Sequence, residues 1–327
     1  MNLRMLGNTG LTVSEIGFGT WGIGGSAEGD VAYGPTNDGD SIQALRRAFD
    51  LGVNFFDTSD LYGFGHSERL LADAFQGLRQ KVIIASKVGF AKQNGSLGQD
   101  FSPQHIRSSL EQSLRRLRSD YIDLYQLHSP AIADLQQEPG ILDLLYSFQK
   151  EGKIRAVGVS ARSPEEALLA ARDLKVRCVQ VNFNLIDQRV VENGFMTYCE
   201  REGVGFIGRT PLCFGFLGGG YSSQTKFDSL DHRSKWPAGQ LDVWANAPQA
   251  FSSVLGKYSG QTPSQLALRY CLSYPGISTV IPGMLTAGHV NENTLASSLG
   301  PFTAEERSEL EEIYKKHTFF LKREKKP

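Results

Sequence analysis

The sequence has little of what marks secreted, membrane-spanning or nucleic-acid-binding proteins. Its four cysteines are scattered and form no Cys-x-x-Cys pair, which favours a reducing, cytoplasmic setting and gives no reason to expect a metal site. The formal net charge is −1, so neither nucleic acid nor an anionic membrane is an expected partner. No run approaches the ~20 apolar residues of a membrane span, and residues 1–4 do not begin a signal peptide.

What the sequence does contain is a regular alternation of strand-like and helical segments. A barrel of eight βα units needs about 250 residues, and insertions lengthen it, so 327 residues suit one such domain. We therefore expect a single α/β domain over residues 1–327, a (β/α)8 TIM barrel, with a polar tail at 318–327. A doubly wound sheet is the alternative, although Gly22–Gly25 lacks the spacing and the following helix of a dinucleotide fingerprint.

The apolar periodicity predicts the individual elements. The expected barrel strands are residues 16–19, 53–57, 81–87, 121–128, 154–160, 178–182, 204–209 and 278–281. The expected helices are 41–51, 67–75, 103–117, 140–150, a segment after 163–166, 193–202, 263–273, 286–296 and 304–316. Residues 3–6 and 11–15 predict an N-terminal β-hairpin. After strand 7, residues 211–260 predict a long irregular loop, and loops of that length are usually functional.

One stretch, Phe55 to Glu68, has the densest set of polar side chains. It begins as a buried strand, becomes polar at Asp57, passes Tyr62 in a glycine-containing loop and enters a helix at Ser67, the expected N-cap. In a barrel of this kind, the carboxyl ends of the strands carry the chemistry. A purely structural interpretation is also open, with Asp57 as a helix cap and Tyr62 as a loop aromatic.

Most of the other expected strands also end in polar side chains. These are Lys87, His128, Ser160, Gln180, Asn182 and Arg209. Each has an ordinary explanation by itself, such as a surface lysine for Lys87 or a satisfied core histidine for His128. Packing does not explain why several chemical types meet at one rim of a barrel.

These segments resemble the motifs of the aldo-keto reductase family over nearly the whole chain. The match includes Asp-x-x-x-x-Tyr-Gly from Asp57, the strand that ends at Lys87, the strand that ends at His128, Gly158-Val159-Ser160, and Ile281-Pro282-Gly283. The resemblance implies four catalytic residues: Asp57, Tyr62, Lys87 and His128. It also implies cofactor contacts from Ser160, Gln180, Arg209, Leu212, Leu217, Gly283, Glu292 and Asn293.

Two positions depart from the family pattern. Ala161 stands where the family usually has Asn, and Asn182 is the candidate replacement for that amide contact. Arg209 stands where a stacking Tyr is common, and its guanidinium could stack on a ring or reach a pyrophosphate.

The implied reaction is the reduction of an aldehyde or ketone to an alcohol by hydride transfer from a nicotinamide cofactor. Tyr62 is expected to protonate the carbonyl oxygen, but free tyrosine has a pKa of about 10. We expect Lys87 to lower that pKa and Asp57 to hold the ammonium in place. His128 is expected to orient the carbonyl.

The family resemblance favours NADP(H), and NAD(H) is the alternative. The turn at residues 281–286 has no cation, and Leu285 stands where family members that prefer NADPH often have one. His289 lies one turn further on and could bind a 2′-phosphate when protonated.

Other functions remain open. The enzyme could be an NAD-linked sugar or alcohol dehydrogenase that works in the oxidative direction. It could be a cofactor-binding regulatory subunit of a membrane partner, or a barrel isomerase or aldolase with Lys87 as a Schiff base. The expected partner is a small carbonyl or alcohol substrate, in a mouth formed by Trp21, Tyr33, Phe64, Phe90, Phe214, Trp236 and Trp244. No sequence feature indicates the oligomeric state.

Overall fold

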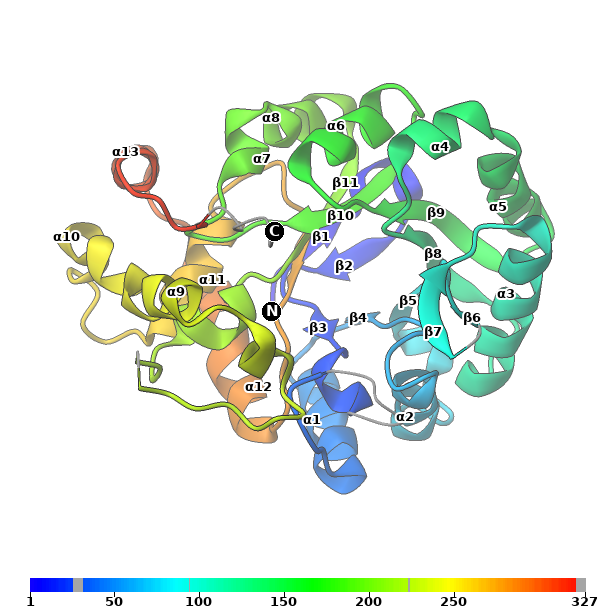
Figure 1. Cartoon of the computed structure of the whole chain (residues 1–327), viewed down its shortest axis with the longest axis horizontal. Coiled ribbons are helices and arrows are strands. Elements are labelled where there is room, and N and C mark those ends of the chain that lie inside the picture. The colour runs from blue at the N-terminus through cyan, green and yellow to red at the C-terminus, as the bar shows by residue number, and fades with distance from the viewer. Residues whose placement is uncertain (26–31, 94, 223, 322–327) are drawn as a thin grey trace.

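Eight parallel strands form a nearly closed barrel in the computed structural model, which describes residues 1–25, 32–93, 95–222 and 224–321. Bridges from Ile16 to Val280 and from Gly19 to Gly283 join the first strand to the last, and the predicted (β/α)8 fold class is confirmed (Figure 1). In sheet order the strands are β3 (Phe18–Gly19), β4 (Phe55–Asp57), β5 (Ile83–Val88), β8 (Ile122–His128), β9 (Ile154–Ser160), β10 (Cys178–Asn182), β11 (Gly205–Arg209) and β12 (Thr279–Ile281).

The helices lie around the outside of the barrel (Figure 1). They are α1 (Asp38–Asp50), α2 (His66–Ala74), α3 (Pro103–Leu117), α4 (Ile132–Gln137), α5 (Gly140–Lys150), α6 (Pro164–Arg172), α7 (Arg189–Glu192), α8 (Phe195–Glu202), α9 (Ala238–Ala250), α10 (Ser252–Leu255), α11 (Pro263–Leu272), α12 (Ala287–Thr294) and α13 (Ala304–Lys315). Reciprocal capping boxes start two of them, Thr262 with Gln265 and Thr303 with Glu306. Among the described residues, no helix has both the length and the apolar character needed to cross a bilayer.

The alternation of side chains along each strand places the rim residues above an apolar interior. An apolar cluster inside the barrel includes Phe55, Ala85, Leu124, Cys178 and Ile207. Side chains two positions apart on a strand face the same way. The residues two positions further on are therefore also directed inward, and these are Asp57, Lys87, Gln126, Gln180 and Arg209.

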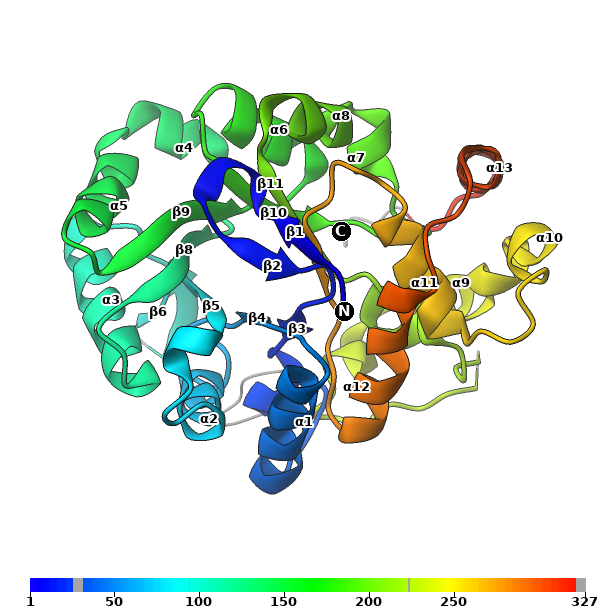
Figure 2. The same cartoon turned by 180° about the vertical axis from the view of Figure 1, so that it is seen from behind.

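The N-terminal hairpin covers the end of the barrel opposite this rim (Figure 2). β1 (Leu3–Met5) pairs antiparallel with β2 (Thr12–Ser14), and Leu6 and Leu11 join the apolar cluster inside the barrel. Gly7, in the turn, has a φ of +50°, and a Cβ there would lie 2.2 Å from the backbone nitrogen of Gly205. Only glycine fits this close approach.

The segment expected to be irregular, 211–260, is partly helical. It contains α9, α10 and two 3₁₀ turns at residues 213–218 and 232–235. The irregular-loop prediction is therefore wrong for this part. Gly239 and Pro248 weaken the helical signal of α9 in the sequence, and tertiary packing compensates, because Trp244 is buried against Phe216.

Two other local expectations need correction, and one further element is new. A second hairpin, β6 (Phe90–Gln93) with β7 (Ser96–Gln99), follows β5 and was not predicted. Ser67 does not cap α2, which begins at His66, and its hydroxyl instead hydrogen-bonds Thr20 Oγ1 at 2.6 Å. Phe319, in the expected polar tail, is buried and stacked on Phe251 with 5.6 Å between ring centroids. Residues 322–327 of that tail lie outside the described residues.

One buried carboxylate links neighbouring strands beneath the rim. Asp123 on β8 accepts hydrogen bonds from the Ile84 amide at 2.9 Å, from Arg79 at 2.8 Å and from Arg155 at 2.7 Å. We expect Asp123→Ala to lower the free energy of unfolding by about 3 kcal/mol, because it leaves partly buried charges without a partner. Urea denaturation measures the change.

The matched control is Asp73→Ala, which removes an exposed pair with Arg118 of the same 2.8 Å length. Solvent screens that pair, so its loss is expected to cost less than about 1 kcal/mol. Equal costs for the two variants would show that Asp123 does not link the strands as described.

Candidate active site

A buried ion pair lies at the centre of the carboxyl-terminal rim. Lys87 Nζ is 2.5 Å from Asp57 Oδ1, and it also donates to the Thr58 carbonyl at 2.8 Å and to the Tyr62 hydroxyl at 3.1 Å. Burial by itself lowers the pKa of Lys87, but Asp57 and Tyr62 together raise that pKa above its usual value. The ammonium therefore stays charged in spite of its burial.

Two amides complete the environment of the carboxylate. Gln180 donates to Asp57 Oδ2 at 2.7 Å, and Gln126 donates to the same oxygen at 3.2 Å. Ser160 in turn donates to Gln180 Oε1 at 3.2 Å. Sequence reasoning missed Gln126, although its position two residues before His128 on the inward face of β8 was a usable signal.

The electrostatic environment of Tyr62 differs from the expectation. Burial raises the pKa of its hydroxyl, and this effect outweighs the lowering by Lys87, so that the net shift is upward. The expected net lowering of the Tyr62 pKa is therefore wrong. The ammonium still stabilises the phenolate relative to an equally buried phenol that has no cation beside it.

His128 is a neutral imidazole at the end of β8. Burial, Lys87 and Arg209 all lower its pKa, to well below the usual value. Its Nδ1 lies 3.2 Å from the Ser59 hydroxyl, and its ring centroid lies 6.1 Å from that of Tyr62. The four predicted catalytic side chains thus meet at one place.

A cavity of about 300 Å³ lies over these groups. Its lining combines Asp57, Tyr62, His128, Gln180 and Arg209 with apolar and aromatic side chains that include Trp21, Tyr33, Leu61, Phe90 and Phe214. Four of the seven predicted mouth residues therefore line it, and the other three do not. Trp236 and Trp244 pack behind Phe214, and Phe64 lines a separate cavity that also contains Asp60.

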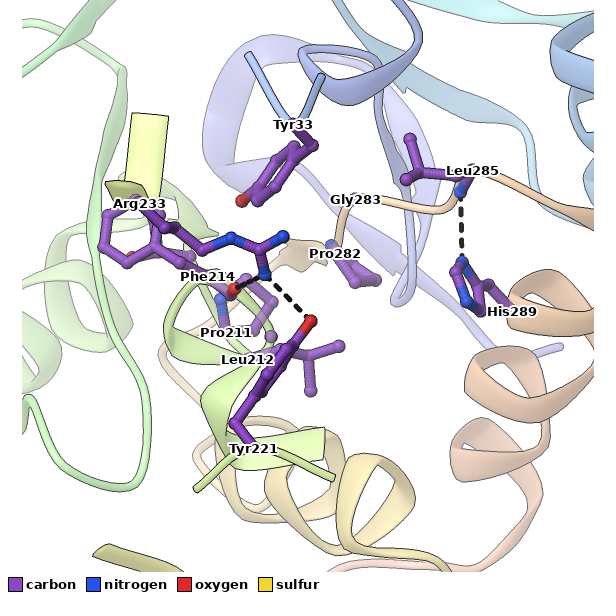
Figure 3. Close-up of a pocket in the computed structure, with 12 residues that line it drawn as sticks. Tyr33, Pro211, Leu212, Phe214, Tyr221, Arg233, Pro282, Gly283, Leu285 and His289 are labelled. Carbon is purple, nitrogen blue, oxygen red and sulfur yellow. Dashed lines mark hydrogen bonds between the residues drawn. The ribbon is translucent and has the colours of Figure 1, made fainter. Parts of the chain in front are cut away.

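A neighbouring cavity of about 130 Å³ extends toward the start of α12 (Figure 3). The two cavities share Tyr33, Thr210, Phe214 and Gly283 in their linings, so together they form one elongated cleft. Arg233 donates to the Tyr221 hydroxyl at 2.8 Å and to the Phe214 carbonyl at 3.1 Å on one wall. The backbone amide of His232 donates to the Ala32 carbonyl at 2.9 Å, which joins two loops that are distant in sequence.

The predicted cofactor residues occupy different parts of this region. Arg209 donates to the Ala161 carbonyl at 3.1 Å, and its buried Nε has no partner among the described residues. Leu212 and Gly283 line the cleft, whereas Leu217 is buried and lines neither cavity.

The remaining candidates lie outside the lining of the cleft. Glu292 accepts a hydrogen bond from Thr262 at 2.7 Å. Asn293 is buried, and its Nδ2 is unpartnered within the described residues. Asn182, the candidate replacement for the missing amide, accepts from the Thr210 hydroxyl at 3.1 Å.

The barrel brings a lysine–aspartate pair, a phenol and an imidazole to a cleft at its carboxyl-terminal rim. Enzymes with this fold have their active sites at that rim. The chain belongs to the aldo/keto reductase family, whose model matches residues 15–315, and it is therefore an oxidoreductase.

Known proteins are similar to it over nearly their whole length. Aldo-keto reductase YhdN of Bacillus subtilis (strain 168) is 29% identical over 92% of this chain and 97% of its own. L-galactose dehydrogenase of Arabidopsis thaliana is 31% identical over 96% of this chain and 94% of its own. The solved structure of a glycerol dehydrogenase from Gluconobacter oxydans superposes with a TM-score of 0.80 at 28% identity and covers 99% of each chain.

The buried pair leads to a stability prediction. Lys87→Met is expected to lower the free energy of unfolding by about 3 kcal/mol, because it leaves the Asp57 carboxylate buried without a cation. The double variant Asp57→Asn/Lys87→Met should recover much of this loss, since no uncompensated charge then remains. Denaturant unfolding of the single and double variants measures the recovery.

Lys153→Met is the control, because Lys153 forms its 2.8 Å pair with Glu111 on the exposed surface. It should change stability by less than about 1 kcal/mol. A double variant no more stable than Lys87→Met would argue against the charge explanation.

Proposed function

We propose that this protein is a nicotinamide-dependent oxidoreductase that reduces aldehydes or ketones to alcohols, with Tyr62 as the general acid. The observation that carries the proposal is the Lys87 ammonium, which donates to both Asp57 and Tyr62 at the base of the cleft. A bound nicotinamide would supply the hydride.

The protein's own residues account for the proton. A substrate carbonyl in the cavity can accept hydrogen bonds from the Tyr62 hydroxyl and from His128. Burial raises the pKa of Tyr62, so the hydroxyl holds its proton at neutral pH but is by itself a weak acid. Once the proton has moved to the carbonyl oxygen, the ammonium of Lys87 stabilises the phenolate that is left.

The cleft fits an elongated cofactor. It runs from the catalytic cavity to the start of α12, and Arg209 has an unpartnered buried Nε among the described residues. In the proposed complex, Ser160, Gln180 and Arg209 would hold the nicotinamide end and Gly283 the middle. Leu212 would cover the cofactor. The resemblance implies further contacts from Leu217, Glu292 and Asn293, but these residues lie outside the lining of the cleft.

The turn before α12 supports NAD(H) more than NADP(H), which the family resemblance favoured. Residues 281–289 contain no lysine or arginine. The Leu285 amide donates to His289 Nδ1 at 3.3 Å, so this nitrogen is already engaged by the backbone of the turn (Figure 3). A 2′-phosphate would therefore find no fixed cation in this turn.

A second candidate function is an NAD-linked dehydrogenase of sugars or small alcohols. The cation-free turn favours it, as do the names of two relatives, L-galactose dehydrogenase and glycerol dehydrogenase. It differs from the first in direction, because oxidation needs Tyr62 as a phenolate and its raised pKa disfavours that form at neutral pH.

Removal of the phenol tests the general acid. Tyr62→Phe should lower kcat for carbonyl reduction by a factor on the order of 10³, because no other group at this position can donate the proton. Cofactor affinity, measured by fluorescence titration, should remain unchanged. Tyr146→Phe, on the outer helix α5, is the control and should retain wild-type kcat, whereas near-normal turnover of Tyr62→Phe would refute the role of Tyr62.

Side-by-side titration with NADH and NADPH tests the cofactor preference. We expect NADH to bind more tightly to the wild type. Leu285→Arg should improve NADPH affinity by about tenfold, because it adds a charge-assisted contact at the turn, while Leu285→Met should leave both affinities as they were. Preferential NADPH binding by the wild type would mean that other residues bind the phosphate.

A further inference from the structure

A hydrogen-bonded chain runs behind the catalytic histidine. Ser59 Oγ lies 3.2 Å from His128 Nδ1 and 3.2 Å from Asp60 Oδ1, and it accepts the Leu61 amide at 3.1 Å. His128 lines the catalytic cavity, whereas Asp60 lines the separate cavity beside the β6–β7 hairpin and α3. The buried hydroxyl of Ser59 thus connects the two cavities.

The hydroxyl of Ser59 has one proton to donate and two lone pairs, and the Leu61 amide uses one of these. When Asp60 is ionised it can only accept, so Ser59 donates to it and must accept a hydrogen bond from Nδ1–H of His128. When Asp60 is protonated it donates to Ser59, and Ser59 then donates to an unprotonated Nδ1. Every group is satisfied in both arrangements.

We infer that Asp60 is a positioning residue which, through Ser59, determines which ring nitrogen of His128 carries the proton. Protonated Asp60 gives the Nε2–H tautomer, which can donate to a substrate carbonyl. Ionised Asp60 gives the Nδ1–H tautomer, whose Nε2 can only accept, as from the hydroxyl of an alcohol. In the change, Asp60 releases one proton to solvent and the imidazole keeps a single proton, which moves from Nε2 to Nδ1.

The surroundings of Asp60 allow the change near neutral pH. Burial raises the pKa of Asp60 to about 7, and Glu68 on α2 contributes in the same direction. Arg116 on α3 opposes the shift, but its Nε donates to Glu68 at 2.6 Å. The other titratable groups beside Asp60 are Tyr125 on β8 and, in the outer cavity, Lys92 and His105.

The groups beside His128 keep the imidazole from simply becoming charged. Lys87 and Arg209, together with burial, hold its pKa well below the usual value. Among the described residues, none hydrogen-bonds Nε2, which leaves this nitrogen for the substrate. The ring therefore responds to Asp60 by changing tautomer and not by gaining charge.

The inference rests on the proposed function, since it assumes a carbonyl or an alcohol at His128. The test is long-range ¹H–¹⁵N NMR of histidine-labelled protein without cofactor, from pH 6 to pH 9, with a His128→Asn variant to identify the resonance. In the wild type, His128 should change from the Nε2–H tautomer to the Nδ1–H tautomer near pH 7. Asp60→Asn, whose side-chain amide does not ionise, should show a His128 tautomer that is independent of pH, and Ser59→Ala should also lose the pH dependence of this tautomer.

Kinetics provide the second readout. Above pH 7, kcat/KM of the wild type for carbonyl reduction should fall by about tenfold per pH unit, and Asp60→Asn should lack this fall. Asp120→Asn, on the exposed loop between α3 and β8, should behave as the wild type in both experiments. A His128 tautomer that does not change with pH in the wild type, or that still changes in Asp60→Asn, would overturn the inference.

The two proposals fail separately. If neither NADH nor NADPH binds, the proposed function is lost, but the NMR result on His128 is unaffected. If the enzyme is active and its tautomer is independent of pH, only the role of Asp60 is lost.

Discussion

The burial of one ammonium against one carboxylate is the constraint on which the rest of this site depends. Taking the charges of Lys87 and Asp57 out of water costs several kcal/mol for each ion, and their attraction offsets the cost only with good geometry and further hydrogen bonds. The Thr58 carbonyl and the amides of Gln126 and Gln180 provide those hydrogen bonds. Because Asp57, Lys87 and the two amides come from four different strands (β4, β5, β8 and β10), the ion pair requires the barrel around it.

The same constraint gives the phenol its chemistry. Tyr62 lies where burial and a neighbouring cation act on its pKa in opposite directions. Burial keeps the hydroxyl protonated, and the cation stabilises the phenolate once the proton has left. Under the proposed function, this hydroxyl gives its proton to a carbonyl, and the cation offsets part of the cost that burial adds.

Much of the fold and of the site could be predicted because it depends on local patterns. The apolar periods of two and 3.6 residues indicated the barrel strands and most helices, and the polar residues that end the strands indicated the rim. The errors lie where distant packing overrides a weak local signal. The packing of Trp244 stabilises a helix in spite of Gly239 and Pro248. Packing against Phe251 buries Phe319 in a segment that was expected to be polar. Residue type also suggested Ser67 as a cap, but Thr20 accepts its hydroxyl.

The sequence by itself therefore determined which side chains reach the rim, because the alternation along a strand is a property of the backbone. Tertiary structure alone decided the sign of the Tyr62 pKa shift, because desolvation depends on every atom packed around the hydroxyl and not on one neighbouring lysine. It also decided that Ser59 stands between His128 and Asp60, since that contact needs the end of β8 to lie beside the loop after β4. No local pattern encodes a distance between segments about 70 residues apart.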